Sequence, residues 1–415
     1  MTDGRTPLVV VAGWSDVAET TARSLLADGT VLIHHDLSRL GEGVVRRTVT
    51  DPDGRARTTV LELAHGCVSC TLREDLLPLL RRLHARSSVR RIAVQLDRTL
   101  EPESLCRAVE EVVVEGVVGQ LDGPASRDVR IEAVIACVDA DSWLDDATGD
   151  RTLLELGLGV GDDERTVAQV VVGQVGCADA LVVAGAGADG WNQARLHAVL
   201  ARLAPTAPID WIGDDLAPDA PRLLARIPAG ARRGAAADAH APLLRGQPPL
   251  ATDCGVTLVE FAAERPFHPE RLHEALDVLL DGVVTARGRL WLATQPDRVL
   301  WLESAGGGLR VGDGGRWLAA MTPDQQEGEP TARRAMAAMR WDERFGDRDV
   351  SLVVLAHAAD PTDIDRALQW ALVTDEELDR QTHWPTWSDP FGQWHQDPCE
   401  ASESPYSDVK REGTA

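Results

Sequence analysis

The sequence predicts an α/β protein in which a mainly parallel sheet, with helices on both faces, is followed by a smaller α+β domain. The first half alternates short apolar runs with amphipathic helical patterns, which is typical of strands joined by crossover helices. Residues 214–253 are rich in Ala, Pro, Gly and Arg and lack a clear period, so they predict a linker. A length of 415 residues allows two or three domains.

The parallel sheet is predicted from seven apolar runs and from the helical patterns between them. Because parallel strands end at one edge of a sheet, ligands of such folds bind at that carboxyl edge. The expected strands are 8–12, 31–33, 58–63, 92–96, 131–138, 180–184 and 209–212, and the expected helices include 20–27, 71–84 and 165–177.

A second domain is predicted after the linker. We divide the chain into a first domain at 1–213, the linker at 214–253, a second domain at 254–378 and a tail at 379–415. The tail carries Trp384, Trp387 and Trp394 among polar residues, and we expect its start to pack against the body. The expected elements of the second domain are strand 256–261, helix 269–280, strands 283–293 and 298–303, and a last strand and helix within 350–372.

Charge and composition exclude several functions. With 66 Asp and Glu against 42 Lys and Arg, the net charge is −24, so we expect no direct binding to DNA or to an anionic membrane. The only lysine is Lys410, near the end, which excludes an ordinary phosphate-loop lysine and a Schiff-base lysine in the body. Without a long apolar segment or a signal-peptide pattern, we expect a cytoplasmic protein.

The turn after the first predicted strand, in AGWSDVAETTA, occupies the place of a phosphate-binding loop. Such a loop uses glycines, a lysine for the outer phosphates and a Ser or Thr for magnesium. Only Gly13, Thr20 and Thr21 fit this requirement, so they are the candidate cofactor-binding residues of a degenerate loop. The alternative is a simple strand-to-helix turn, which we favour.

A second candidate site is the Cys67-x-x-Cys70 pair, which opens a predicted helix. Thr71 and Glu74 fit a capping box, and leucines 72, 76, 79, 80 and 83 form one apolar stripe. Two thiolates with His65 provide three possible zinc ligands, and tetrahedral zinc requires a fourth. A redox pair and a purely structural pair remain alternatives. The other cysteines in apolar patterns, which we expect to be buried, are Cys106, Cys137 and Cys177.

Several histidines and one aspartate are weaker candidates. His34 and His35 are adjacent on a predicted strand, so their side chains point to opposite faces. For His268 and His273 we expect packing at a helix start rather than a pair of ligands. Asp139 ends a predicted strand where a cleft residue usually lies, and the alternative is a helix cap. No Ser-His-Asp order stands out, and we predict no catalytic residue.

These motifs together resemble the CobW-like GTPase family of metal-homeostasis proteins. The similarity spans both halves, through AGWSDVAETTA, HGCVSCTLREDLL, CVDA, ADALVVAGAG, RPFHPERL, GRLWLA and GDRDVSLVVLAH. It implies a P-loop-NTPase-like first domain and a CobW C-terminal-like second domain. The GCVSC, RPFHP and GRLWLA segments and the tail DPFGQWHQDPC further resemble the actinobacterial ribosome hibernation factor-recruiting branch (MRF).

The sequence departs from that family at each nucleotide element. Asp16, Ala18 and Glu19 replace the loop's two glycines and lysine, and a lysine ~4 Å from a phosphate charge is worth roughly 4 kcal/mol at an effective dielectric of ~20. At the end of the next strand of the nucleotide site, Gln95 replaces the family's acidic residue and Arg98 its glycine. Residues 184–187 replace the guanine-reading element Asn-Lys-x-Asp. We therefore expect GTP and magnesium to bind weakly or not at all.

The resemblance implies an adaptor function. Its leading form is a pseudo-GTPase that recruits a ribosome hibernation-promoting factor to the small ribosomal subunit during zinc limitation. The alternatives are an active metal-handling GTPase or zinc metallochaperone, and a Cys-x-x-Cys zinc or redox sensor. The family has a cysteine at the position of Ser69, so this chain retains two of the family's three thiol ligands for zinc.

Overall fold

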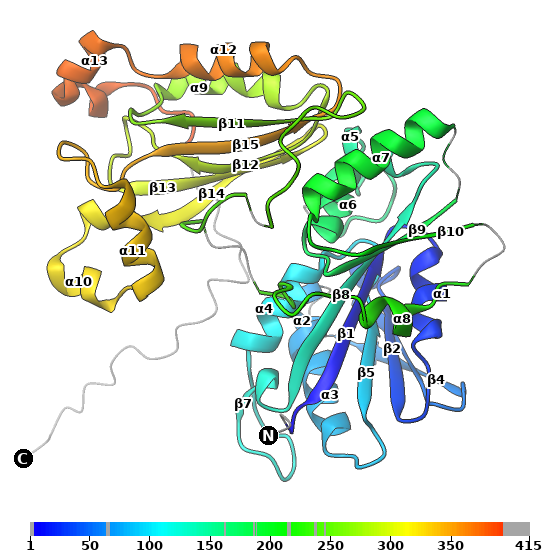
Figure 1. The fold of residues 1–415 in the computed structure, drawn as a ribbon. Helices are drawn as coiled ribbons and strands as arrows, with labels where there is room; N and C mark the ends of the chain where they lie inside the picture. Colours follow the sequence, from blue (N-terminus) through cyan, green and yellow to red (C-terminus); the bar gives the residue numbers. More distant parts are fainter. Residues whose placement is uncertain are drawn as a thin grey trace, which may run out of the picture.

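The structure is a computed structural model that describes residues 4–63, 67–161, 163–185, 187, 189–213, 217–235, 239–244 and 246–392. It contains two sheets, each with its own hydrophobic core, joined by the segment between β10 and β11 (Figure 1). No helix of this part of the chain is long and apolar enough to cross a bilayer.

The first sheet has eight strands in the order β10-β9-β8-β1-β5-β2-β3-β4, which confirms the predicted mainly parallel architecture. Only β3 and β4 run antiparallel to their neighbours, at one edge. The strands are β1 (Thr6–Gly13), β2 (Thr30–Asp36), β3 (Val44–Thr50), β4 (Ala56–Glu62), β5 (Arg91–Gln95), β8 (Val129–Asp139), β9 (Ala180–Ala184) and β10 (Ile209–Ile212).

Helices cover both faces of this sheet because its central strands are apolar on both sides. On β1, Leu8 and Val10 point into one core, while Val9 and Val11 point into another, as the two-residue period of a strand requires. Helices α1 and α8 lie on the second face. The helices are α1 (Val17–Ser24), α2 (Val68–Thr71), α3 (Leu77–His84), α4 (Pro102–Glu111), α5 (Trp143–Thr148), α6 (Val167–Gly176), α7 (Gly190–Leu203) and α8 (Ala220–Leu224), with a small ribbon of β6 (Val113–Val114) and β7 (Gly123–Pro124).

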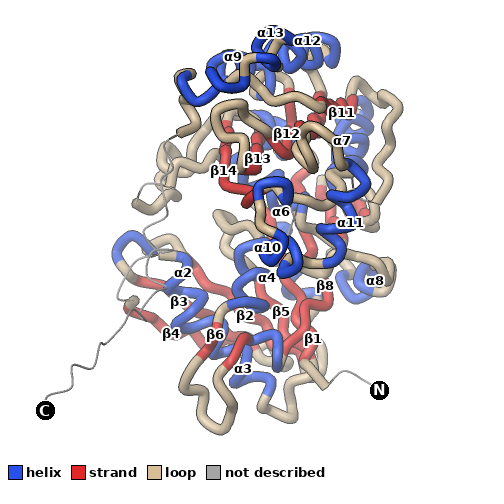
Figure 2. The backbone as a smooth tube through the Cα atoms, turned by 90° about the vertical axis from the view of Figure 1, so that its left-hand side faces the viewer, coloured by secondary structure: helices blue, strands red, loops and turns tan. Residues whose placement is uncertain are grey.

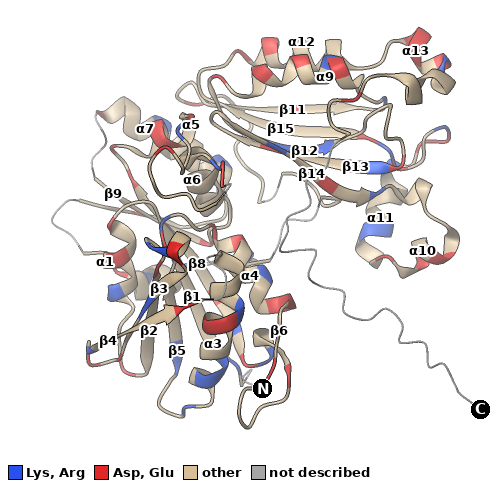
Figure 3. Ribbon diagram, turned by 180° about the vertical axis from the view of Figure 1, so that it is seen from behind, with Lys and Arg blue, Asp and Glu red and all other residues tan. Residues whose placement is uncertain are grey.

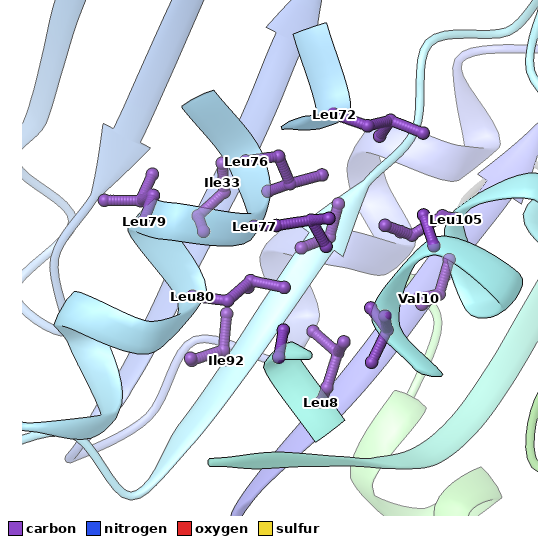
Figure 4. Packing of buried hydrophobic residues seen from close by; sticks show 14 of the residues in the cluster. Leu8, Val10, Ile33, Leu72, Leu76, Leu77, Leu79, Leu80, Ile92 and Leu105 are labelled. Carbon is purple, nitrogen blue, oxygen red and sulfur yellow. The ribbon is translucent and has the colours of Figure 1, made fainter. Parts of the chain in front are cut away.

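The leucine stripe predicted for helix 71–84 is the main contact of that helix with the sheet. Leu76 is 2% exposed, and Leu80 is fully buried. Figure 4 shows these side chains pointing toward Leu8, Val10 and Ile92 of the neighbouring strands. At ~25 cal/mol per Å² of buried apolar surface, each buried leucine contributes about 2 kcal/mol, so the stripe fixes the helix on the sheet.

The second sheet is antiparallel, in the order β11-β15-β12-β13-β14. One face is covered by α9 and α12, and the other faces α5, α6 and the linker (Figures 1 and 2). The elements are β11 (Thr257–Ala263), α9 (Pro269–Ala275), β12 (Val283–Leu290), β13 (Arg298–Ala305), β14 (Gly308–Arg316), α10 (Pro323–Gly328), α11 (Thr331–Arg340), β15 (Val350–Ala356), α12 (Pro361–Ala371) and α13 (Asp375–Asp379).

The described part of the linker is anchored to both domains. Arg233 N donates to Asp179 Oδ1 of the first domain at 2.9 Å, and Arg289 of the second domain donates to the carbonyl of Ala239 at 2.9 Å. The start of the tail also packs: Trp384 is 4% exposed, and the ring of Trp387 stacks on His268 at 4.4 Å. Trp394 and Lys410 lie outside the described residues. The domain boundaries stay predictions.

Charged side chains are distributed over both domains. Figure 3 shows acidic groups on α12 and α13 at the outer end of the second domain, and arginines interspersed elsewhere. Many arginines are used within the chain, as in the pair of buried Arg81 with Asp128 at 2.7 Å.

Candidate functional site

The turn after β1 is a short strand-to-helix connection. Strand β1 ends at Gly13 and α1 begins at Val17. The backbone N–H groups of Ala18 and Thr20 donate to the carbonyls of Ser15 at 3.1 Å and Asp16 at 3.2 Å. A phosphate loop needs these N–H groups to be directed at the ligand. Here they are already used within the turn and the helix.

The three predicted cofactor-binding residues do not form one surface. A Cβ at Gly13 would lie 2.8 Å from Cys137 Cβ, so this glycine permits close packing against β8. The Thr20 side chain is exposed, whereas Thr21 is fully buried beside β8. Glu19, at the position of the family's lysine, is on the exposed side of α1 and pairs with Arg23 at 2.9 Å. The charge of Glu19 is thus already paired along the helix.

Arg98 occupies the space beside the turn. It follows β5, and its guanidinium lies 5.8 Å from the centre of the Trp14 ring. Trp14 also packs against the core beneath α5 and α6. Asp97 accepts a hydrogen bond from the N–H of Leu37 at 3.2 Å, which fixes the segment after β2. Of the positions that replace Asn-Lys-x-Asp, Ala186 lies outside the described residues.

The two cysteines are adjacent in space at the start of a helix. Cys67 Sγ lies 3.0 Å from Cys70 Sγ, and it also accepts a hydrogen bond from the backbone N–H of Cys70 at 3.3 Å. Both side chains are partly exposed. Two cysteine sulfurs this close can bind one metal ion together. His65, the third predicted ligand, lies outside the described residues.

The N-cap of the helix lies four residues earlier than the capping box predicts. Cys67 is the N-cap of α2, whereas Thr71 is inside the helix, 3% exposed, and its hydroxyl donates to the carbonyl of Cys67 at 3.3 Å. The predicted box of Thr71 and Glu74 is therefore wrong, because the thiol of Cys67 accepts the capping hydrogen bond instead. A π-helical segment, Leu72–Leu76, then leads into α3.

A cavity of about 520 Å³ lies beside Cys67, at the carboxyl edge of the sheet. Its charged lining includes Asp36, Asp97 and Asp163 together with Arg39 and Arg165. Burial raises the pKa of Asp163, but the ion pair with Arg165 outweighs it and leaves the pKa below the ordinary value. The same balance, with Ser38 and Arg46 as partners, lowers the pKa of Asp36. The cavity is therefore ionic and holds charged carboxylates at neutral pH.

A buried charge cluster beneath the cysteine helix was missed by sequence reasoning. Asp75 Oδ2 lies 2.8 Å from His35 Nε2, and Asp75 Oδ1 accepts from Arg47 of β3. Asp75 and His35 are each 6% exposed. The sequence contains a signal for this cluster, because Asp75 lies on the apolar leucine stripe of its own helix, where a carboxylate must be buried and paired. His34, by contrast, is directed to the carbonyl of Gln95 at 3.2 Å, so the two histidines do have separate environments.

The other weak candidates have structural roles. Asp139 Oδ1 accepts from the backbone N–H of Asp141 at 3.0 Å in the turn after β8. The N-cap of the following helix α5 is Ser142, so the helix cap considered for Asp139 is not formed. His268 stacks on Trp387 and begins α9. Cys106, Cys137 and Cys177 are buried, as expected.

The fold combines a P-loop-NTPase-like parallel sheet with an antiparallel C-terminal domain. The family model "CobW/HypB/UreG, nucleotide-binding domain" matches residues 36–209, and "Cobalamin synthesis protein cobW C-terminal domain" matches residues 256–372. The first match begins after the turn between β1 and α1. The chain belongs to the CobW family.

Relatives and solved structures extend this comparison. A Mycobacterium tuberculosis H37Rv protein named a zinc chaperone is 48% identical over 399 residues, which cover 95% of both chains. Zinc-regulated GTPase metalloprotein activator 1 of Dictyostelium discoideum is 22% identical over 93% of this chain and 84% of its own. The Zn(II)-bound YjiA GTPase from E. coli is 14% identical, covers 89% of this chain and 99% of its own, and has a TM-score of 0.38.

Proposed function

We propose that the protein handles zinc, binding Zn²⁺ as cargo through Cys67 and Cys70 and passing it to another protein. The observation that carries this proposal is the pair of thiols 3.0 Å apart beside an ionic cavity at the carboxyl edge of the sheet. The names of the relatives, a zinc chaperone and a zinc-regulated GTPase activator, agree with it.

The donor set fits a cargo site. Thiolates are preferred zinc ligands, and two of them fill half of a tetrahedral shell. Within the described ranges no group of three or more His, Cys, Asp or Glu side chains could hold a metal. Coordination positions left to His65, to water or to a receiving protein allow an ion to be released, whereas a closed four-ligand site would retain it.

Zinc affinity measured by competition with a chromogenic chelator tests this proposal. Cys67→Ser and Cys70→Ser should each weaken binding more than about tenfold, since even the loss of a group that only orients a ligand costs 10–100-fold. Cys254→Ser is the matched control, because this thiol is also partly exposed but lies just before β11, at the start of the second domain. Wild-type affinity in both cysteine variants would refute the site.

On the nucleotide side, we propose that zinc handling here does not use a conventional GTP-binding loop. The occupied N–H groups of the turn and the outward Glu19 support this. Calorimetry with GTP and magnesium, followed by a phosphate-release assay, tests it. Micromolar binding with turnover would instead support an active metal-handling GTPase.

A second proposed function is that of an adaptor in the MRF branch, which would recruit a ribosome hibernation-promoting factor to the small ribosomal subunit. The observation that favours it is the replacement of the nucleotide elements in a strongly acidic chain, which suits contact with a basic protein. A pull-down from zinc-depleted cells tests it. Enrichment of the factor and of small-subunit proteins supports recruitment, and their absence refutes it.

A further inference from the structure

A second cavity, of about 430 Å³, lies between the two domains. Its walls come from the ends of α6 and α7, from the linker, and from β11, β12, β13 and β15. Figures 1 and 2 both show α6 and α7 next to the second sheet, and α6 contacts β13. None of its lining residues lines the Cys67 cavity. It is a separate feature that zinc handling does not use.

The second sheet presents polar side chains to this cavity. Arg287 of β12 and Glu303 of β13 are cross-strand partners, and Trp301 lies on the same face, two residues from Glu303. The indole Nε1 of Trp301 donates to Glu303 Oε1 at 2.7 Å. The alternate residues Leu300 and Leu302 are fully buried in the core beneath α9 and α12. The strand pattern therefore places the polar residues Arg287 and Glu303 in the cavity, whereas β11 and β15 line it with Leu258, Val353 and Leu355.

Arg202 is a deeply buried cation in the cavity wall. It is 5% exposed, its Nη atoms donate to the carbonyls of Ala198 at 2.7 Å and Ala251 at 2.6 Å, and its Nε has no hydrogen-bond partner. Burial lowers its pKa below the ordinary value. A buried charge is normally paired with an opposite charge. Among the described residues Arg202 forms no ion pair with a carboxylate, and the charge of Asp253 only partly offsets the effect of burial on its pKa.

Arg232 supplies a second positive charge from the linker. It donates to the carbonyl of Gly176 at 2.8 Å and to that of Ala235, and it too has no carboxylate partner within the described ranges. The charged lining of the cavity is three arginines and one glutamate. In a chain with a net charge of −24, a cavity with an excess of two positive charges is a local exception.

We propose that this cavity binds a small organic anion with an apolar body. The acid group lies against Arg202 and Arg232, whose two positive charges attract it within the cavity. The apolar body packs on Leu258, Val353 and Leu355 of the sheet. Such a ligand contacts both domains and the linker at once, so its binding holds the two domains in this arrangement.

Isothermal titration calorimetry of the full chain with 1-naphthoate tests the proposal, with the uncharged 1-naphthamide as the matched ligand. We expect one naphthoate site, with naphthamide at least about tenfold weaker, because it lacks the charge that the two arginines attract. Arg202→Gln and Arg232→Gln should each weaken naphthoate at least about tenfold. Arg226→Gln, an exposed arginine that pairs with Asp210 outside the cavity, should leave it unchanged.

Thermal unfolding of each variant shows whether it folds, and if Arg202→Gln does not, the less buried Arg232 decides the outcome. Cys67→Ser should bind naphthoate as the wild type does, which separates this site from the zinc proposal. Equal naphthoate affinity in the wild type and the cavity variants, or no naphthoate binding at all, would overturn the proposal.

Discussion

Restoring the missing lysine with Glu19→Lys separates two reasons for weak GTP binding. If charge alone is the obstacle, this single change removes a repulsion and adds an attraction. If the backbone of the turn is the obstacle, a lysine cannot repair it. The structure favours the second reason, because the N–H groups of Ala18 and Thr20 are bonded within the turn and the helix.

The two reasons differ widely in magnitude. For a side chain ~4 Å from a phosphate, removing the acid relieves a repulsion of roughly 4 kcal/mol at an effective dielectric of ~20. Adding a lysine in its place gains an attraction of roughly 4 kcal/mol more. The Glu19 side chain, however, is 53% exposed and pairs with Arg23 along α1. Screened by water and salt, a lysine there contributes about 1 kcal/mol or less, which is under a tenfold gain in affinity.

Fluorescence titration with a labelled GTP analogue and magnesium measures this gain. We expect Glu19→Lys to bind less than tenfold more tightly than the wild type. Its stability should fall by less than about 1 kcal/mol, since an exposed i,i+4 pair is worth only ~0.3–0.5 kcal/mol. An increase in affinity above a hundredfold would show that the turn can open around a phosphate, and the argument from the backbone would be wrong.

Three further predictions concern groups outside the turn. Asp75→Asn should lower the free energy of unfolding by about 3 kcal/mol in urea denaturation, because it breaks a buried ion pair, whereas an exposed Asp→Asn control should change little. Iodoacetamide should leave Cys137 and Cys177 of the native protein unmodified, because burial raises the pKa of each thiol to about 12. Peptide mass spectrometry detects the modification, and rapid labelling of either thiol would contradict the packing. Burial raises the pKa of Glu377, but hydrogen bonds from Arg271 and Thr374 outweigh it and leave the pKa below the ordinary value. Its contribution is therefore present at neutral pH and decreases as the pH falls below the ordinary carboxyl range of about 4. The stability difference between wild type and Glu377→Gln should shrink steadily in acid, and a difference that stays constant from neutral pH to about pH 3 would be inconsistent with this linkage.

The regular elements could be predicted because their packing follows from local periodicity. The stripe that includes Leu76 and Leu80 specifies one helix face, and burial on the sheet follows from it. The continuous apolar run of β1 likewise requires cover on both faces. Strand β14, with four glycines in nine residues, has no such pattern and was missed, because its place depends on pairing with β13.

The site geometry could not be predicted in the same way. Several groups compete for each hydrogen bond, and only the folded chain shows which of them forms it. The sequence offers both Cys67 and Thr71 as caps, and only the folded turn shows that the thiol is used. The contact of Asp75 with His35 joins residues 40 positions apart, so no local pattern contains it. Arg202 is an ordinary helical arginine in sequence, and its burial arises from the linker that crosses over it.

The closed turn at β1 limits how zinc could be released. In a nucleotide-driven carrier, a change at the phosphate would move the loop that holds the metal, since both lie at the carboxyl edge of one sheet. Here the N–H groups of Ala18 and Thr20 are bonded within the turn and the helix, while Cys67 borders a cavity formed by the segments after β2 and β5. In the proposed carrier, release is then driven by a group that enters this cavity or by a receiving protein that completes the coordination shell. Ligand exchange with a third thiolate or imidazole is the simplest such step, because two thiolates leave positions open to it. A small thiol added to the zinc-loaded protein should accordingly accelerate transfer to a chelator, and GTP should not.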